Sequence, residues 1–422
     1  MPTAQGVRIH LIIGASVAAL AVPGRAAADA VTDWNAILVE SLRVTNAAPP
    51  NSGRLAATVH GAVYDAVNGI VGRYTPLRVA GSAPPGASRD AAAIEAAYRT
   101  LSWAFPERQS DLDAYRAQSL AAIAADHLEG LQSPSVQRGL HWGQLVADEY
   151  IGWRSNDGFA PPPPPFIGST ALGVWRPTPP AFAAGAFPQL GHTLPFALSN
   201  LDAYATRGPP EVWSHEYASD FNEILAIGGT SAMLSARDIA FFWRPNSVVS
   251  WNEVARELSE GAALTLIENA RLFALLNVAM ADATRACWRD KYDYVFWRPI
   301  TANEFANEDG NGDTAPLDAW NTLFATPNHP EYPSGHSAIS ASATTALASL
   351  FGETTPFSMT TTDPAALQKT RSYSSFDAAS DEVNDSRVYA GLHFRSAVVD
   401  GQALGRAVAE AILASEFLRS RP

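Results

Sequence analysis

Apolar residues recur at the three- to four-residue spacing of amphipathic helices along almost the whole of the 422-residue chain, and alanine is abundant. Segments that alternate apolar and polar residues, the pattern of a half-buried strand, are absent from the sequence. Such helices bury their apolar faces by packing against one another. The sequence therefore predicts an all-α protein made of one or two helical bundles. Helices are expected over residues 32–45, 53–70, 88–104, 109–127, 134–154, 214–227, 235–244, 250–264, 267–297, 336–351 and 386–418.

Five consecutive prolines, Pro161–Pro165, interrupt this helical pattern and open an irregular stretch that runs to about residue 210. A proline run cannot continue a helix and favours an extended polyproline conformation. We therefore expect an N-terminal helical region over residues 29–159, a connector over 160–212 and a C-terminal helical catalytic region over 213–422. The connector contains tryptophan, phenylalanine and leucine, so we expect it to lie against the protein and to roof the functional site.

The first 28 residues have the pattern of an export signal. Arg8 and His10 precede the apolar run 11–22, and three small residues, 26–28, offer a cleavage site. The apolar run is too short to span a membrane, and no later segment approaches about 18 uninterrupted apolar residues. We therefore predict a periplasmic or secreted protein with no stable membrane span, with an uncleaved anchor as the alternative.

The charge and cysteine content exclude several classes of partner and site. With 29 basic and 42 acidic residues the formal charge is −13, which disfavours binding to nucleic acid or to an anionic membrane. Cys287 is the one cysteine, so an intramolecular disulfide and a cysteine-ligated iron–sulfur cluster are impossible. It lies in an apolar helical pattern, so we expect it to pack in the core rather than to act as a nucleophile.

Three short motifs in the last third of the chain carry the chemistry. They supply three cations, a hydroxyl beside a glycine amide, and two histidines, which together suit a tetrahedral oxyanion such as phosphate or vanadate. In order they are Lys291-x6-Arg298-Pro299, Pro333-Ser334-Gly335-His336 and Ser386-Arg387-x5-His393. Taken singly, each motif also fits a plainer role, as exposed basic residues, a helix cap or a core histidine. The combination favours an oxyanion site.

The spacing within the motifs predicts local geometry. On one helix Lys291 and Arg298 would share a face about 10.5 Å apart along the axis, with Pro299 ending the helix. Ser334 is a good N-cap, and the glycine after it lets an anion approach the backbone. Arg387 and the histidine six residues later would point about 120° apart on an ideal helix. Either the arginine reaches around, or the helix distorts near the glycine at 391.

In this order and at these separations the motifs resemble the signature shared by vanadium-dependent haloperoxidases, type-2 phosphatidic acid phosphatases and bacterial acid phosphatases. The resemblance implies the helical-bundle fold of that superfamily. It also implies that Lys291, Arg298 and Arg387 bind the oxygens of the anion, assisted by the Ser334 hydroxyl and the Gly335 amide. It makes His393 the apical metal ligand of a peroxidase or the phosphorylated nucleophile of a phosphatase, and His336 the acid–base group of either.

Two residues outside the shared signature favour the peroxidase branch. Trp288 resembles a tryptophan of the vanadium haloperoxidases, and His329 resembles a histidine of the algal bromoperoxidases. The resemblance thus implies a vanadate cofactor, hydrogen peroxide and a halide as substrates, with bromide or iodide favoured, and a small organic acceptor. Homo-oligomers are a further expectation, although no sequence feature fixes the number of subunits.

The chain departs from the superfamily pattern at two positions. An aspartate usually follows the apical histidine by four residues, where this chain has Ala397, and Asp400 lies about two helical turns from His393. The sequence therefore leaves open which group orients that histidine, and a backbone carbonyl would serve. After the pair Phe242-Trp243, Asn246 stands where an aspartate would assist the acid–base histidine.

These departures leave two alternatives open. The protein could be an acid phosphatase that works through a phosphohistidine at His393, with His336 protonating the leaving group. It could also be a non-catalytic protein that binds an oxyanion reversibly.

Other polar residues carry weaker expectations. His60 and Asp65 would point to different faces of one helix and make structural contacts. The segment 309–313, rich in aspartate and glycine, resembles a calcium loop in composition but lacks the spacing to a glutamate, so we expect a turn-rich connector. His192 and His215 lie in or near the irregular stretch, where they could reach the site.

Overall fold

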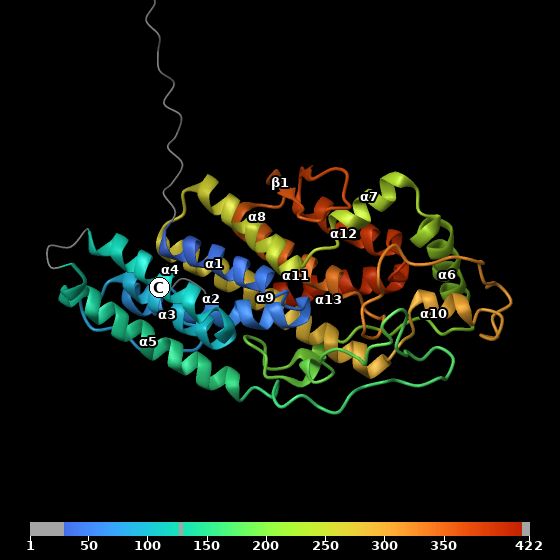
Figure 1. Ribbon diagram of the computed structural model, residues 1–422, viewed down its shortest axis with the longest axis horizontal. Helices are drawn as coiled ribbons and strands as arrows, with labels where there is room; N and C mark the ends of the chain where they lie inside the picture. The colour runs from blue at the N-terminus through green and yellow to red at the C-terminus, as the bar shows by residue number, and fades with distance from the viewer. Residues whose placement is uncertain (1–28, 126–129, 416–422) are drawn as a thin grey trace, which may run out of the picture.

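The computed structural model describes residues 29–125 and 130–415, and the segment 1–28 predicted as an export signal lies outside them (Figure 1). Helices dominate the described part of the chain, as predicted for an all-α fold. The α-helices are α1 Ala30–Val44, α2 Pro49–Val71, α3 Arg89–Ala104, α4 Gln109–Ala124, α5 Pro134–Ser155, α6 His215–Ile227, α7 Leu234–Phe242, α8 Ser247–Ala262, α9 Leu266–Tyr294, α10 Pro299–Glu304, α11 Gly335–Phe351, α12 Phe376–Tyr389 and α13 Arg395–Ala414.

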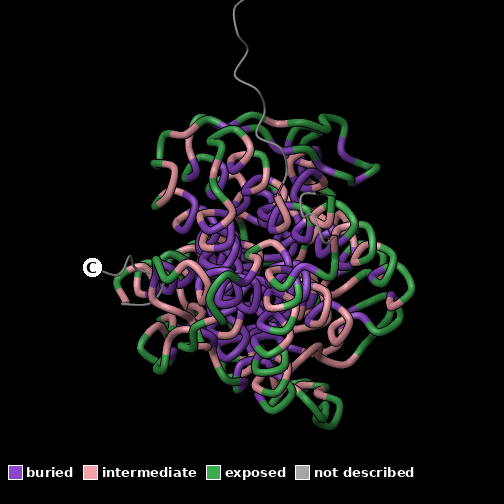
Figure 2. The backbone as a smooth tube through the Cα atoms, turned by 90° about the vertical axis from the view of Figure 1, so that its left-hand side faces the viewer, coloured by how far each residue is buried: buried purple, intermediate pink, exposed green. Residues whose placement is uncertain are grey.

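Helix α9 is the central element of the fold. It is 29 residues long and packs against α2 on one side and against α11 and α13 on the other. In Figure 1 helices α1–α5 gather at one end of the elongated molecule, and α6, α7, α10 and α12 lie towards the other. The largest apolar cluster runs from α1 through α9 to α13, and Figure 2 shows the buried residues concentrated along the inside of the helical assembly.

Glycines set the close approach of α13 to α11. A Cβ added to Gly405 would lie 2.1 Å from the carbonyl oxygen of Ala338, and one added to Gly401 would lie 2.7 Å from that of Ser334. Neither contact is sterically possible, so only glycine at these positions lets the two helices touch. The contact holds the start of α11, which carries the Pro-Ser-Gly-His motif, against the C-terminal helix.

Two of the helix predictions are wrong. Helix α9 ends at Tyr294 because Val295 takes a left-handed conformation with φ 50°, so Arg298 is not on that helix but at the N-cap of α10. The single helix expected over 386–418 is two helices, α12 and α13, and α12 begins ten residues earlier than the predicted start. Gly391 has φ 77° in the break between them. The backbone therefore distorts at this glycine, the second of the two possibilities that the spacing left open.

A short β-hairpin was not expected from the sequence. Strands β1 Phe357–Thr360 and β2 Thr370–Tyr373 pair antiparallel, with Phe357 opposite Tyr373. Each strand has four residues, too few for an alternating pattern to stand out.

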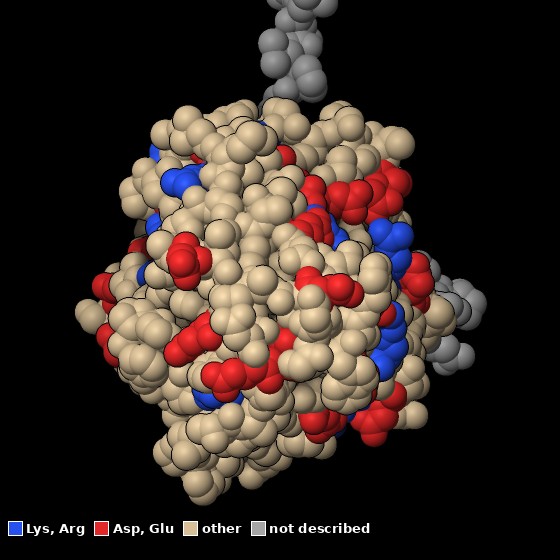
Figure 3. Space-filling view, turned by 90° about the vertical axis from the view of Figure 1, so that its right-hand side faces the viewer, with Lys and Arg blue, Asp and Glu red and all other residues tan. Residues whose placement is uncertain are grey.

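The long irregular stretch between α5 and α6 lies along one side of the molecule (the green trace in Figure 1). Acidic side chains outnumber basic ones on the face that Figure 3 displays. No described helix is both long and apolar enough to cross a lipid bilayer.

Candidate active site

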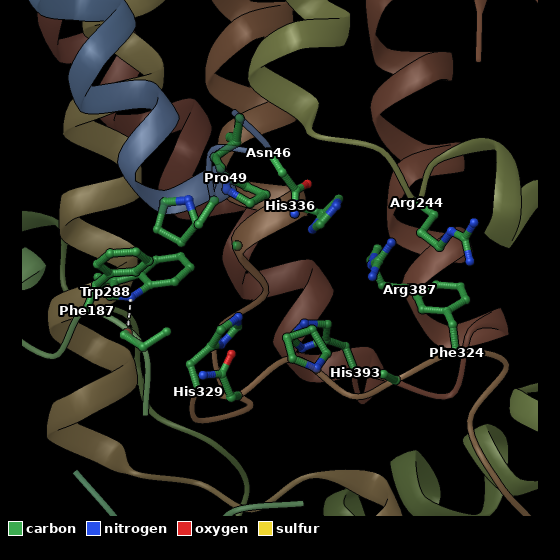
Figure 4. Close-up of a pocket in the computed structure, with 18 residues that line it drawn as sticks. Asn46, Pro49, Phe187, Arg244, Trp288, Phe324, His329, His336, Arg387 and His393 are labelled. Carbon is green, nitrogen blue, oxygen red and sulfur yellow. Dashed lines mark hydrogen bonds between the residues drawn. The ribbon is translucent and has the colours of Figure 1, made fainter. Parts of the chain in front are cut away.

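The three motifs converge on a cavity of about 680 Å³. Gly335, His336, Arg387 and His393 line it, together with Trp288 and His329, and the side chains face one another across it (Figure 4). Part of its remaining wall comes from distant parts of the chain. Asn46, Ala48, Pro49 and Pro50 lie at the junction of α1 and α2, and Ala186 and Phe187 belong to the irregular stretch.

The N-terminus of α11 faces the cavity. Ser334 is its N-cap and is fully buried, and its hydroxyl oxygen accepts from the amide of Ser337 at 3.4 Å. Gly335 is the first residue of the helix, whose amide has no acceptor within the helix. A Cβ added to Gly335 would lie 3.0 Å from the Trp288 ring, so a larger residue here would press against that ring. The helix start thus offers the positive end of its dipole to an anion.

Lys291 is fully buried on the last turn of α9 and ties that helix to the loop before Ser334. Its ammonium donates to the backbone carbonyls of Pro330 at 3.1 Å, Glu331 at 2.9 Å and Pro333. Burial lowers the pKa of Lys291 to about 8. Its side chain lies behind the cavity wall rather than on it, so it supplies positive charge from beneath the loop.

Arg298 is also fully buried, and its guanidinium links His329 to His393. It donates to the carbonyl oxygens of His329 and Leu392, both at 3.0 Å. Its Nη2 lies 2.9 Å from Nδ1 of His329, and its Nη1 lies 3.3 Å from Nε2 of His393. Burial lowers its pKa to about 10.

Arg387 is the cation on the cavity wall with the fewest partners. It is buried near the end of α12, and among the described residues its one hydrogen bond is a long one of 3.4 Å from Nη1 to the carbonyl of Trp243. Its Nε is buried without a partner. Burial, followed by repulsion from Arg298, lowers the pKa of Arg387 to about 9. This guanidinium therefore has donors available for a bound anion.

His393 is oriented by a carboxylate that sequence reasoning missed. Nδ1 of His393 lies 2.9 Å from Oε1 of Glu331, which also accepts the amide of Phe394 at 3.0 Å. Burial raises the pKa of Glu331 to about 8, against the opposing effects of Arg298 and Lys291. A side-chain carboxyl group, rather than a backbone carbonyl, therefore contacts this ring nitrogen. Glu331 is the one acidic residue in the proline-rich segment 325–333, and this is the signal that could have indicated it.

Ala397 and Asp400, the two residues considered in connection with the orientation of His393, make other contacts. Ala397 is fully buried and its carbonyl accepts the amide of Ser334 at 2.9 Å. Asp400 accepts from the hydroxyl of Tyr332 at 2.7 Å and forms an ion pair with Arg207 at 3.1 Å.

His336 points into the cavity from the first turn of α11 (Figure 4). Its Nε2 is buried without a partner, and burial together with Arg387 holds its pKa well below the usual range, while the carbonyls of Arg244 and Pro245 act in the opposite direction. Asn246 does not assist it. This asparagine caps α8 and donates to the hydroxyl of Ser52 at 2.8 Å.

Trp288 and His329 lie side by side on the cavity wall. Their ring centroids are 4.9 Å apart, and the indole donates to the carbonyl of Ala186 at 3.2 Å. This hydrogen bond fixes the irregular stretch over the site, as expected of a segment that roofs it. His192 and His215 are exposed and do not line the cavity.

The remaining polar residues make structural contacts. Nε2 of His60 lies 2.9 Å from the amide nitrogen of Asn35, and Asp65 accepts three backbone amides and the hydroxyl of Tyr150. Cys287 is fully buried, and burial raises its pKa to about 12, which agrees with a packing role. In the turn-rich segment, Asp309 accepts from the amide of residue 311 and the hydroxyl of residue 314.

The balance of charge around the cavity fits an oxyanion. Arg387 lines the cavity, and Lys291 and Arg298 are buried behind its wall. Glu331 is a buried acidic residue that interacts with Arg298 and Lys291. Buried charge is costly unless it is compensated. The unpaired nitrogen atoms of Arg387 and His336, and the glycine amide beside them, would each gain a partner from a bound tetrahedral anion such as vanadate.

Comparison with known proteins agrees with this geometry. Residues 271–419 match the family model of the second helical-bundle domain of vanadium chloroperoxidase. The structure is similar to that of the first bacterial vanadium-dependent iodoperoxidase, with a TM-score of 0.78, 24% identity, and coverage of 93% of this chain and 96% of that one. The chain has the vanadium haloperoxidase fold.

Two further proteins are similar to this chain. The holo form of a bacterial vanadium-dependent chloroperoxidase aligns with a TM-score of 0.67 and 14% identity over 92% of this chain and 93% of that one. The vanadium chloroperoxidase of Curvularia inaequalis is 28% identical over an alignment that covers 29% of this chain and 24% of that protein. The chain thus spans about a quarter of the length of this curated relative.

Proposed function

We propose that this protein is an exported, vanadate-dependent haloperoxidase that oxidises a halide with hydrogen peroxide. The observation that carries the proposal is the set of three buried cations around a histidine whose Nδ1 is held by a carboxylate. Because a hydrogen on Nδ1 leaves Nε2 with a lone pair, His393 is prepared to act as a metal ligand from the cavity side. When bound, vanadate would act as a Lewis acid that polarises peroxide towards attack by halide.

In this proposal the protein binds and orients the anion. Lys291, Arg298 and Arg387 offset its charge, and the start of α11 offers the Ser334 hydroxyl and the Gly335 amide. His336 has a buried nitrogen without a partner, placed to exchange a proton with a substrate oxygen. Its pKa lies well below the usual range in the free protein, so it enters the reaction as a base.

The rest of the cavity suits a halide and a small organic acceptor. Beyond the charged groups the wall is mainly apolar, formed by Pro49, Phe187, Trp288 and Phe324 among others (Figure 4). A mainly apolar cavity of several hundred cubic ångströms with a few polar groups is typical of small-molecule sites. His329 lies against Trp288 within this wall, and its likeness to the histidine of bromoperoxidases supports bromide or iodide as the halide.

A phosphatase remains the second candidate, and Glu331 is the observation that favours it. A histidine nucleophile needs a fixed tautomer, and the hydrogen bond from Nδ1 of His393 to this carboxylate supplies one. The alanine at 397 therefore does not count against a phosphohistidine mechanism.

One pair of assays separates the candidates. Metal-stripped protein is divided, with and without orthovanadate, and tested for bromination with bromide and peroxide and for hydrolysis of p-nitrophenyl phosphate. The peroxidase predicts bromination that appears only with vanadate and is lost in His393→Ala. Hydrolysis in the metal-free sample that vanadate suppresses, without bromination, would make the protein a phosphatase. Inactivity in both assays would leave a protein that only binds the anion.

A further inference from the structure

We propose that Glu331 is the positioning residue of His393, and that it replaces from the loop before α11 the aspartate that the chain lacks at position 397. The inference deepens the proposed function and rests on it for the role of His393. In this proposal the carboxylate fixes the plane and the tautomer of the imidazole, so that Nε2 faces the bound anion.

The hydrogen bonds of Oε1 define that geometry. Oε1 accepts from Nδ1 of His393 at 2.9 Å and from the amide of Phe394 at 3.0 Å, so one oxygen holds both the ring and the backbone beside it. Phe394 is the N-cap of α13 and makes no side-chain cap of its own. The carboxylate thus ties the histidine to the start of that helix, and Nε2 is left on the opposite edge of the ring, facing the cavity and 3.3 Å from Arg298.

The backbone of Glu331 is held from both sides. Its amide donates to the carbonyl of Phe296 at 2.9 Å, and its own carbonyl accepts from the ammonium of Lys291 at 2.9 Å. The residue is fully buried. A carboxylate on such a fixed backbone can act as a rigid support, since neither its main chain nor its side chain has room to move.

The carboxylate is not engaged in an ordinary ion pair. Arg298 and Lys291 give their recorded hydrogen bonds to backbone carbonyls and histidine nitrogens, and Oε2 of Glu331 is buried without a partner. Among the described residues, the side chain of Glu331 is therefore hydrogen-bonded to the ring of His393 and to the backbone amide of Phe394. A residue that served only to neutralise the cations would direct both oxygens at them.

The residue at position 397 cannot orient the ring of His393. It lies on the first turn of α13, four residues after His393, and holds a fully buried alanine whose carbonyl accepts the amide of Ser334. The methyl group there can make no hydrogen bond to the ring. The function of an acid on α13 has passed to an acid on the facing loop, and the two positions approach the same ring from different elements.

Two conservative variants separate position from charge. Glu331→Gln keeps the length of the side chain and an oxygen that can accept from Nδ1, but removes the ionisable carboxyl group. Glu331→Asp keeps the ionisable group and withdraws it by one methylene group. Asp400→Asn is the matched control, because it changes a carboxylate that contacts the adjacent Tyr332 and not His393.

The first readout is the tautomer of His393 in the metal-free protein, from the 15N chemical shifts of its ring. Wild type, Glu331→Gln and Asp400→Asn should carry the hydrogen on Nδ1, and Glu331→Asp should show a mixture of tautomers.

The second readout is the dissociation constant for orthovanadate, with inorganic phosphate as a second anion. Loss of a group that orients a metal ligand typically weakens metal affinity roughly 10- to 100-fold, the effect expected for Glu331→Asp. Glu331→Gln should keep the affinity of the wild type.

The reverse order, with Glu331→Gln impaired and Glu331→Asp normal, would overturn the proposal in favour of charge alone. An unchanged tautomer and affinity in both variants would overturn it as well. The haloperoxidase proposal fails separately. If wild-type protein binds orthovanadate with the expected ranking of variants but brominates nothing, the positioning role stands and the peroxidase does not.

Discussion

Replacing Arg387 with methionine should make the metal-free protein more stable while removing its ability to bind the anion. Arg387 is buried, its Nε has no partner, and its one recorded hydrogen bond is 3.4 Å long. The side chain is therefore a charge held in the interior for a ligand. Methionine fills a similar volume and carries no charge to desolvate.

The magnitude follows from the pKa of this guanidinium, which burial lowers from 12.5 to about 9. A difference of that size corresponds to about 5 kcal/mol of cost for the charged form in the folded state. Because the pKa is lowered, the cost is fully present below about pH 9 and declines as the pH rises from there towards 12.5. Replacement of buried ionic groups by apolar ones typically recovers about 1–4 kcal/mol, which is the gain expected at pH 7.

Urea unfolding followed by tryptophan fluorescence, with and without orthovanadate, measures both effects. Saturating ligand stabilises the folded protein by about 2.7 kcal/mol at a hundredfold excess over the dissociation constant, so the wild type should gain this and Arg387→Met should not. Arg244→Met is the control on the same cavity. Arg244 forms an ion pair with the buried Asp363, including a 2.8 Å hydrogen bond from Nη2 to Oδ1, so its loss should destabilise the protein. Lower stability of Arg387→Met in the absence of anion would refute the reasoning.

Two further variants test the charge and the wall of the cavity. The affinity of the wild type for phosphate should fall relative to that of Lys291→Arg as the pH rises through about 8, by up to roughly tenfold per pH unit, because the lysine loses its charge there and the arginine does not. The ratio of the two dissociation constants cancels the titration of phosphate itself, and a ratio that stays flat between pH 7 and 10 would mean that Lys291 does not act through its charge. His329→Phe should change the relative rates of iodide and bromide oxidation, since it removes the nitrogen 2.9 Å from Arg298, and an unchanged ratio would show that His329 does not set halide preference.

The motif residues could be predicted from sequence because their chemistry is local. A serine and a glycine at a helix start, or a cation a few residues from a proline, form patterns within one short segment. The all-α fold followed for the same reason, since helical periodicity is visible within about a dozen residues. The break between α12 and α13 was foreseen as one of two possibilities, because a straight helix would point Arg387 and His393 in different directions.

The pairing of Glu331 with His393 could not be predicted in this way, since 62 residues separate them. The contact depends on how closely α13 approaches α11, which the glycines at 401 and 405 allow and which no local pattern reveals. The end of α9 at Tyr294 was missed for a related reason. Val295 adopts a left-handed conformation that β-branched residues avoid, and its backbone is held by a pairing in which its carbonyl accepts the amide of Trp175 at 2.7 Å.

The cavity is assembled from stretches of chain that lie far apart in the sequence. The groups expected to hold the anion lie between residues 291 and 393, whereas much of the apolar wall is contributed by residues 46–50 and 186–187. Substitutions in those two remote segments can reshape the space beside the anion without altering any residue of the three motifs. Under the proposed function, such substitutions would change which organic molecule is halogenated without changing the groups that bind the anion, and a library confined to the two segments is the economical place to look for altered acceptors.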